Sequence, residues 1–197
     1  MSEQALSTQA FCPNCNTVSQ FLAYQQRAYI TVVFVPLIPL GKRPVQWVCS
    51  SCGFAARPEV LTAAQSRHEE QLGVALRASM AYMLRRISPG NGVLALVGDL
   101  ASGCFGISPE YSAAHAARDL DWFVEHGCTP YIEPARGLLV GDMREDFFGL
   151  VAVLGIHLAD TQPNPEPHIT DLAYIGDTVG LSAIHQQGII QHIRSIN

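Results

Sequence analysis

Two Cys-x-x-Cys pairs constrain this chain more than any other feature of its sequence. The first is Cys12-Pro-Asn-Cys15, and the second, after 33 intervening residues, is Cys49-Ser-Ser-Cys52. Four thiolates from two such knuckles suit a tetrahedral Zn²⁺ site, and four protein ligands leave the metal no open position. The spacing therefore predicts one structural zinc ion per chain, held by Cys12, Cys15, Cys49 and Cys52.

The same cysteines have two other interpretations, disulfide bonds or a redox motif. Disulfides form in oxidising compartments, and the first ten residues, MSEQALSTQA, have neither the basic nor the apolar region of a secretory signal. A redox Cys-x-x-Cys of the thioredoxin type occurs once and opens a helix, whereas here two pairs flank a strand-rich stretch. Zinc is therefore favoured. We expect a cytoplasmic protein, and contact with the inner face of the membrane is left open.

The charge distribution argues against nucleic acid as a partner. Charged residues make up 15% of the chain, against about 25% in ordinary soluble domains, which favours burial in an oligomer, against a protein partner or at a membrane. Residues 1–57 carry a net charge of +3 and residues 58–197 a net charge of −8. Four thiolates and Zn²⁺ add about −2 to the first part, so it lacks the basic face that nucleic acid requires. No apolar stretch reaches the roughly 20 residues of a spanning helix.

Residues 1–57 form the first predicted domain, a small β zinc ribbon with a long hairpin insertion. The β-branched and aromatic run 29–35 predicts a strand, residues 40–42 predict a turn, and residues 45–49 predict the returning strand. Pro36 and Pro39 exclude a central strand beyond residue 35. The insertion is too apolar for a small ribbon to bury, so we expect it to dock on the helical domain, with a partner or membrane contact as the alternative. The apolar residues concerned are Phe34, Leu37, Ile38 and Leu40.

Residues 58–197 form the second predicted domain, which is all-α. Apolar periodicity and boundary residues predict helices over 58–87, 93–102, 108–126, 144–159, 166–179 and 182–194. Residues 128–137 are expected to be a loop, with an optional short helix over 138–143. The pattern Gly92-x-x-Ala95-x-x-Gly98-x-x-x-Ser102 recurs from Gly149 to Ala159. This internal repeat predicts a helical bundle with a two-fold pseudo-repeat, in which the two glycine faces cross.

Both parts resemble known families. The two knuckles, together with the intervening sequence Phe34-Val-Pro-Leu-Ile-Pro-Leu-Gly-Lys42, resemble a bacterial zinc-ribbon family over residues 10–54. Residues 70–196 resemble the TerB-like family, named for tellurite resistance, through Ala159-Asp160, Glu166 and Val179-Gly-Leu-Ser182. Thr161 replaces the glycine that usually follows the aspartate. These resemblances imply a zinc-bound ribbon fused to a scaffold that acts in a bacterial metal or envelope stress response.

A second metal site is a further candidate, which the TerB-like resemblance also suggests. Its ligands would be His157, Asp160, Glu166 and Asp171, since imidazole and carboxylate groups bind divalent cations. His157 and Asp160 are three residues apart and share a helix face. The alternative, which we favour, is ordinary helix chemistry, with Glu166 in a first helical turn where the dipole favours a carboxylate.

Three functions are consistent with these features. The first is a non-catalytic interaction or scaffold protein, acting as a homo-oligomer or with a protein partner. The second is a nucleic-acid-binding zinc ribbon, and the third is a metal-dependent hydrolase that uses the site around Asp160. The chain contains no G-x-S-x-G, P-loop, G-x-G-x-x-G or H-E-x-x-H motif, so the prediction leans away from an enzyme.

Overall fold

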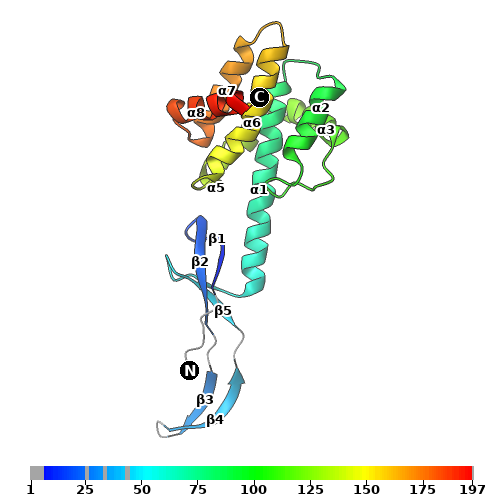
Figure 1. Ribbon diagram of the computed structural model, residues 1–197. Helices are drawn as coiled ribbons and strands as arrows, with labels where there is room; N and C mark the ends of the chain where they lie inside the picture. Colours follow the sequence, from blue (N-terminus) through cyan, green and yellow to red (C-terminus); the bar gives the residue numbers. More distant parts are fainter. Residues whose placement is uncertain (1–6, 25–26, 33–34, 43–44, 197) are drawn as a thin grey trace. The chain divides into compact units, whose positions relative to one another are not determined.

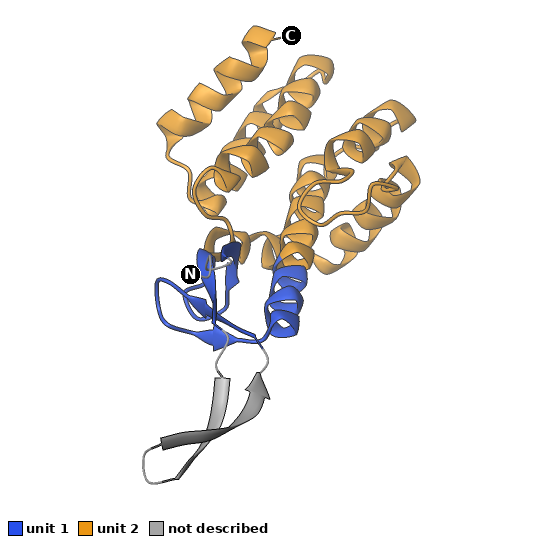
Figure 2. Cartoon of the chain, turned by 60° about the horizontal axis from the view of Figure 1, so that its bottom comes forward, with its two compact units in different colours: residues 1–68 blue, residues 69–197 orange. Residues whose placement is uncertain are grey.

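A computed structural model describes residues 7–24, 27–32, 35–42 and 45–196, with the backbone alone for residues 27–32 and 35–42. The chain divides into two compact units, residues 1–68 and 69–197, shown in different colours in Figure 2. The expected docking of Phe34, Leu37, Ile38 and Leu40 concerns side chains that lie outside the described residues.

Unit 1 contains the β structure of the chain (Figure 1). Its strands are β1 (Ser7–Cys12), β2 (Thr17–Tyr24), β3 (Arg27–Val32), β4 (Val35–Lys42), β5 (Gln46–Cys49) and β6 (Ala55–Ala56). An antiparallel sheet has the order β1-β2-β5-β6, and β3 and β4 form a two-stranded sheet. This four-stranded sheet, called the ribbon below, carries the two cysteine pairs at the ends of β1 and β5.

The predicted pairing inside the insertion is wrong. Strand β3 pairs with β4 and not with residues 45–49, whereas β5 pairs with β2. Pro36 and Pro39 were expected to exclude a central strand, and both lie within β4, whose single neighbour is β3. A strand with a single neighbour tolerates proline, because only one of its edges needs N–H donors. The register also shifts at two places in this hairpin, between Ala28 and Tyr29 and between Ile30 and Thr31.

The helices follow the predicted order. They are α1 (Pro58–Leu84), α2 (Asn91–Ala101), α3 (Ala113–His126), α4 (Thr129–Ile132), α5 (Ala135–Leu138), α6 (Met143–Thr161), α7 (Glu166–Val179) and α8 (Ala183–Ile196). Within its described residues, unit 2 contains no strand. The coarse prediction of a β ribbon with an all-α part is therefore confirmed. No helix in the described part of the chain is long and apolar enough to span a membrane.

The first three turns of α1 belong to unit 1, which ends at His68. Leu61 is 5% exposed and packs with the ribbon residues Cys12 and Phe21. The backbone N–H of Phe11 donates a hydrogen bond to Gln65 Oε1 at 3.0 Å. A ribbon this small cannot bury enough apolar surface by itself, and the start of α1 supplies the missing cover.

In unit 2, the second half of α1 is the central helix (Figure 1). Its buried residues include the apolar series Leu72, Leu76, Met80, Met83 and Leu84, and also Ala75, Ala78, Ser79 and Ala81 on the other sides of the helix. A helix that is apolar on all sides is an interior helix. Its buried residues share one core cluster with residues of α2, α3, α6 and α7, and α2 and α3 pack on each other.

Boundary residues explain where most helices begin and end. Gly180 ends α7 with a positive φ of 87°, and the Leu181 N–H donates to Gly176 O at 2.9 Å, which is a Schellman motif. Helix α3 begins at Ala113, with Ser112 at its N-cap, and not at residue 108, because the Ser108 hydroxyl accepts the Glu110 N–H in a local turn. The predicted loop 128–137 contains most of two short helices, α4 and α5.

The predicted pseudo-twofold with crossing glycine faces is not shown by the described residues. Gly98 contacts the backbone of Ser112, at the start of α3, whereas Gly155 contacts the side chains of Met83 and Leu172. The two equivalent glycines therefore meet different elements, and not each other.

Candidate metal centre

Each cysteine pair lies on a turn that follows a strand, and the two turns are built alike. Cys12 ends β1, and its carbonyl accepts the N–H of Asn16 at 2.8 Å. Cys49 ends β5, and its carbonyl accepts the N–H of Gly53 at 2.9 Å. Asn16 and Gly53 both have positive φ, 53° and 73°, which asparagine and glycine adopt most readily. The two residues occupy equivalent positions, each directly after the second cysteine of its pair.

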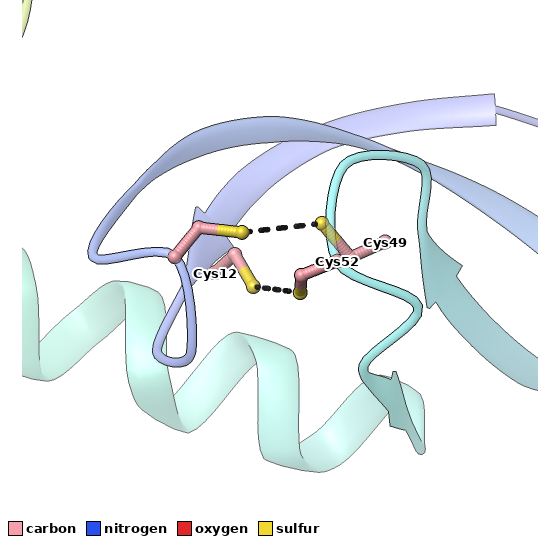
Figure 3. A group of neighbouring side chains, drawn as sticks. Cys12, Cys49 and Cys52 are labelled. Atoms are coloured by element: carbon pink, nitrogen blue, oxygen red, sulfur yellow. Dashed lines mark hydrogen bonds between the residues drawn. The ribbon is translucent and has the colours of Figure 1, made fainter.

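The two turns bring the four sulfurs together (Figure 3). The Sγ atoms of Cys12 and Cys52 are 3.7 Å apart, and those of Cys15 and Cys49 are 3.8 Å apart. All four Sγ atoms lie within 4.8 Å of one another. These distances exclude disulfides, whose sulfurs are about 2.05 Å apart, and all four cysteines are free.

The sulfur arrangement fits one metal ion. A tetrahedral ion with metal–sulfur bonds of about 2.3 Å holds its ligands about 3.8 Å apart, which is the separation observed in both close pairs. Tetrahedral four-sulfur sites take zinc or iron. Cys12 and Cys49 are buried at the inner side of the cluster, whereas Cys15 is half-buried and Cys52 is exposed. The site therefore lies at the surface of the ribbon, with its two strand-end cysteines in the core.

Backbone donors favour the thiolate form of part of this cluster. Burial opposes ionisation of Cys49, but hydrogen bonds from the backbone N–H groups of Cys52 and Ser51, together with those to the thiols of Cys52 and Cys12, lower its pKa to about 6. A hydrogen bond from the Asn14 side chain lowers the pKa of Cys52. The hydrogen bond with Cys52 and burial raise the pKa of Cys15 to about 12. A bound cation supplies the charge that also keeps such thiols deprotonated.

The core beneath the site is small and aromatic. Phe21 on β2 is fully buried, and it packs with Cys12, Cys49, Ala56 and Leu61. Phe11 stacks on His68 of α1, with ring centroids 4.1 Å apart. The metal ligands are thus part of the same cluster that attaches the start of α1 to the sheet.

The second candidate site has no comparable geometry. In the described part of the chain, the four cysteines are the one group of three or more potential ligands within reach of a single ion. His157, Asp160 and Glu166 are exposed. Asp171 is buried and accepts two hydrogen bonds from Arg85. It follows Glu166 by five residues, about 140° around the helix, so the two carboxylates point in different directions. The four residues are not brought together as a ligand set.

No protein-family model, curated protein or solved structure matches this chain.

Proposed function

We propose that this protein is a non-catalytic interaction or scaffold protein whose ribbon is held by one structural zinc ion. The observation that carries the proposal is the cluster of four Sγ atoms within 4.8 Å of one another. With four protein ligands, a tetrahedral ion has no position for water or substrate. The metal then contributes folding free energy to a ribbon with a very small core.

Exposed apolar side chains support an interaction role. Trp122 and Val124 of α3 are 42% and 53% exposed, and Ile184 at the start of α8 is 81% exposed. Trp and Tyr are enriched at protein interfaces. Together with the low content of charged residues, this surface favours a protein partner or a homo-oligomer over nucleic acid.

The cellular setting rests on resemblance. The TerB-like pattern of residues 70–196 suggests a cytoplasmic scaffold in a bacterial metal or envelope stress response, such as tellurite resistance. A deletion strain is then expected to be more sensitive to tellurite, with rescue by the wild-type chain and not by Cys49→Ser. A deletion strain as tolerant as its parent would remove the stress-response part of the proposal and leave the zinc ribbon unaffected.

The metal is tested by elemental analysis of natively purified protein. We expect one zinc per chain, no iron, and loss of the zinc in Cys49→Ser. Cys128→Ser is the matched control, because Cys128 is a buried cysteine of unit 2 outside the cluster. Hydrogen exchange after chelation should show loss of protection in β1, β2 and β5, with protection kept in α6 and α7. No metal, iron in place of zinc, or more than one metal per chain would contradict the proposal.

A further inference from the structure

Unit 2 contains a groove of about 760 Å³ between α6 and α8, bordered by the segment that follows α2. Its volume lies within the range of about 300–1,000 Å³ that is typical of small-molecule sites. Helix α6 lines it from Glu145 to Val153, and α8 lines it from Gly188 to Ile193. The eight helical steps from Glu145 to Val153 span about 12 Å, so the groove is long enough for an extended apolar chain.

Two glycines leave the groove open. A Cβ atom added at Gly149 or at Gly188 would meet no atom within 4 Å beyond its chain neighbours and the backbone of its own helix, although each glycine lies inside a helix. Glycine at such positions costs about 1 kcal/mol of helix stability relative to alanine. Neither glycine is required by a close contact or by a positive φ. The walls beside them are apolar, formed by Leu150, Val153 and Ile189 among others. The result is an unfilled apolar channel along the two helices.

One end of the groove is acidic. Glu145 and Asp146 line it from the first turn of α6, and no ion pair among the described residues includes either of them. The guanidinium of the adjacent residue Arg144 forms no ion pair with these carboxylates. It donates hydrogen bonds to Leu139 O at 3.1 Å and to Arg136 O at 3.4 Å.

A helix N-terminus by itself attracts anions, and the two carboxylates reverse that preference at the groove. The other titratable groups that line it are Cys104 and His192. The groove thus combines an apolar channel with a net negative end, and its charge complements a cation.

We propose that this groove binds an amphiphile with a cationic head and an unbranched apolar tail. The head lies at Glu145 and Asp146, and the tail runs over Gly149 and Gly188. The site is separate from the cysteine cluster, and it does not depend on the bound metal.

The test is calorimetric titration of the full-length protein with three probes below their micelle concentrations: decyltrimethylammonium, decyl sulfate and tetramethylammonium. Decyltrimethylammonium should bind with one site per chain and at least fivefold more tightly than decyl sulfate. Tetramethylammonium should show no saturable binding, because it has no tail. Shortening the tail should weaken binding by up to about fourfold per methylene, and added salt should weaken it further because the carboxylates are exposed.

Two variants locate the site. Gly188→Leu fills the channel without a clash at Cβ and should weaken decyltrimethylammonium binding at least tenfold, with an unchanged or higher melting temperature. The double variant Glu145→Gln with Asp146→Asn should weaken the cation about fivefold and remove the discrimination against decyl sulfate. The matched control is Asp121→Asn with Glu125→Gln, which removes the same charge from exposed positions of α3 and should leave binding unchanged.

Cys104 provides an independent readout, because it lines the groove and has a free thiol. Decyltrimethylammonium should slow alkylation of Cys104, measured by peptide mass spectrometry, in the wild-type chain and not in Gly188→Leu. Equal affinity for the cationic and anionic probes, unchanged binding in Gly188→Leu, or no binding of the cationic probe would each overturn the proposal. Binding of a basic amphipathic peptide in place of the small amphiphile would overturn it as well.

Discussion

Arg85 holds the buried carboxylate of Asp171 through two hydrogen bonds, from Nη1 at 2.7 Å and from Nη2 at 2.8 Å. The pair joins the end of α1 to α7. The Asp171 side chain is 3% exposed and that of Arg85 is 21% exposed. A second arginine, Arg86, is 3.6 Å from the same carboxylate, but its side chain is 55% exposed. One carboxylate thus has two cationic neighbours in very different environments.

Arg85→Ala should destabilise unit 2 strongly, by about 3 kcal/mol, because it leaves the Asp171 carboxylate buried without its main partner. Arg86→Ala is the matched control and should cost less than about 0.5 kcal/mol, since its charge is largely in solvent. Urea denaturation followed by circular dichroism measures both free energies of unfolding. Equal losses in the two variants would show that the bidentate geometry is unimportant.

This pair also shows what sequence reasoning could not supply. Asp171 was a candidate metal ligand because its sequence neighbours include other acidic groups. Its actual partner lies 86 residues earlier in the chain, and local periodicity carries no information about that pairing. The four cysteines were predictable because the ligand spacing itself carries the chemistry.

The residues that mark the ends of helices and strands predicted some boundaries correctly and others wrongly, because local preferences carry no information about distant partners. Pro58, Gly127 and Gly180 act through their own backbone preferences, and each lies at the end of a helix as expected. The predicted helix start at residue 108 was wrong, because the Ser108 hydroxyl is used in a local turn. The partner of β3 was also missed, because a proline-containing strand is acceptable in a two-stranded sheet and not in a central position.

Tyr111→Phe should change the alkaline stability of unit 2. The Tyr111 hydroxyl donates to Asp119 Oδ2 at 2.7 Å, and burial, with help from that hydrogen bond, raises the pKa of Tyr111 well above its usual value of 10.0. Because the folded pKa lies above the unfolded one, this stabilisation is complete below about pH 10 and is lost as the pH rises further.

Two results are therefore expected from urea denaturation between pH 7 and 11. At pH 7 the variant should be less stable by about 1–2 kcal/mol, from the lost hydrogen bond to a charged group. Above pH 10 its stability should fall less steeply than that of the wild type. Tyr131→Phe, which keeps the ring contacts with Trp122 and Phe123, is the control and should follow the wild-type profile. Parallel profiles for Tyr111→Phe and the wild type would rule out this linkage.

Leu61→Ala should loosen the ribbon and speed the release of its metal. Leu61 is 5% exposed in the cluster that contains Cys12 and Cys49, whereas its neighbour Val60 is 49% exposed. Truncation of a buried leucine lowers the free energy of unfolding by about 2–5 kcal/mol, whereas truncation of an exposed valine lowers it much less. The rate of metal release to a chelator is measured for Leu61→Ala and for Val60→Ala. Hydrogen exchange of β2 is the second readout. Identical rates would mean that the start of α1 does not support the ribbon.

Gly176→Ala should destabilise the contact between α7 and α8, although alanine is the better helix former. A Cβ atom at this position would overlap the side chain of Gln186, with Nε2 and Oε1 each 2.6 Å away. Gln186 cannot move freely, because it is 5% exposed and its Nε2 donates to Asp177 Oδ1 at 2.8 Å and to Leu181 O at 3.0 Å. Overpacking of this kind costs about 1–3 kcal/mol, which exceeds the propensity gain of up to about 1 kcal/mol.

The matched control for this variant is Gly188→Ala, in the next helix, where the added methyl group meets nothing within 4 Å. It should raise the free energy of unfolding by about 0.5–1 kcal/mol, from helix propensity alone. The double variant Gly176→Ala with Gln186→Ala separates overlap from other causes. If overlap is the cause, the double variant will lose less free energy of unfolding than the sum of the losses in the two single variants, since removal of the glutamine side chain relieves the clash. Strict additivity would instead mean that the alanine acts on the backbone of α7 and not through Gln186.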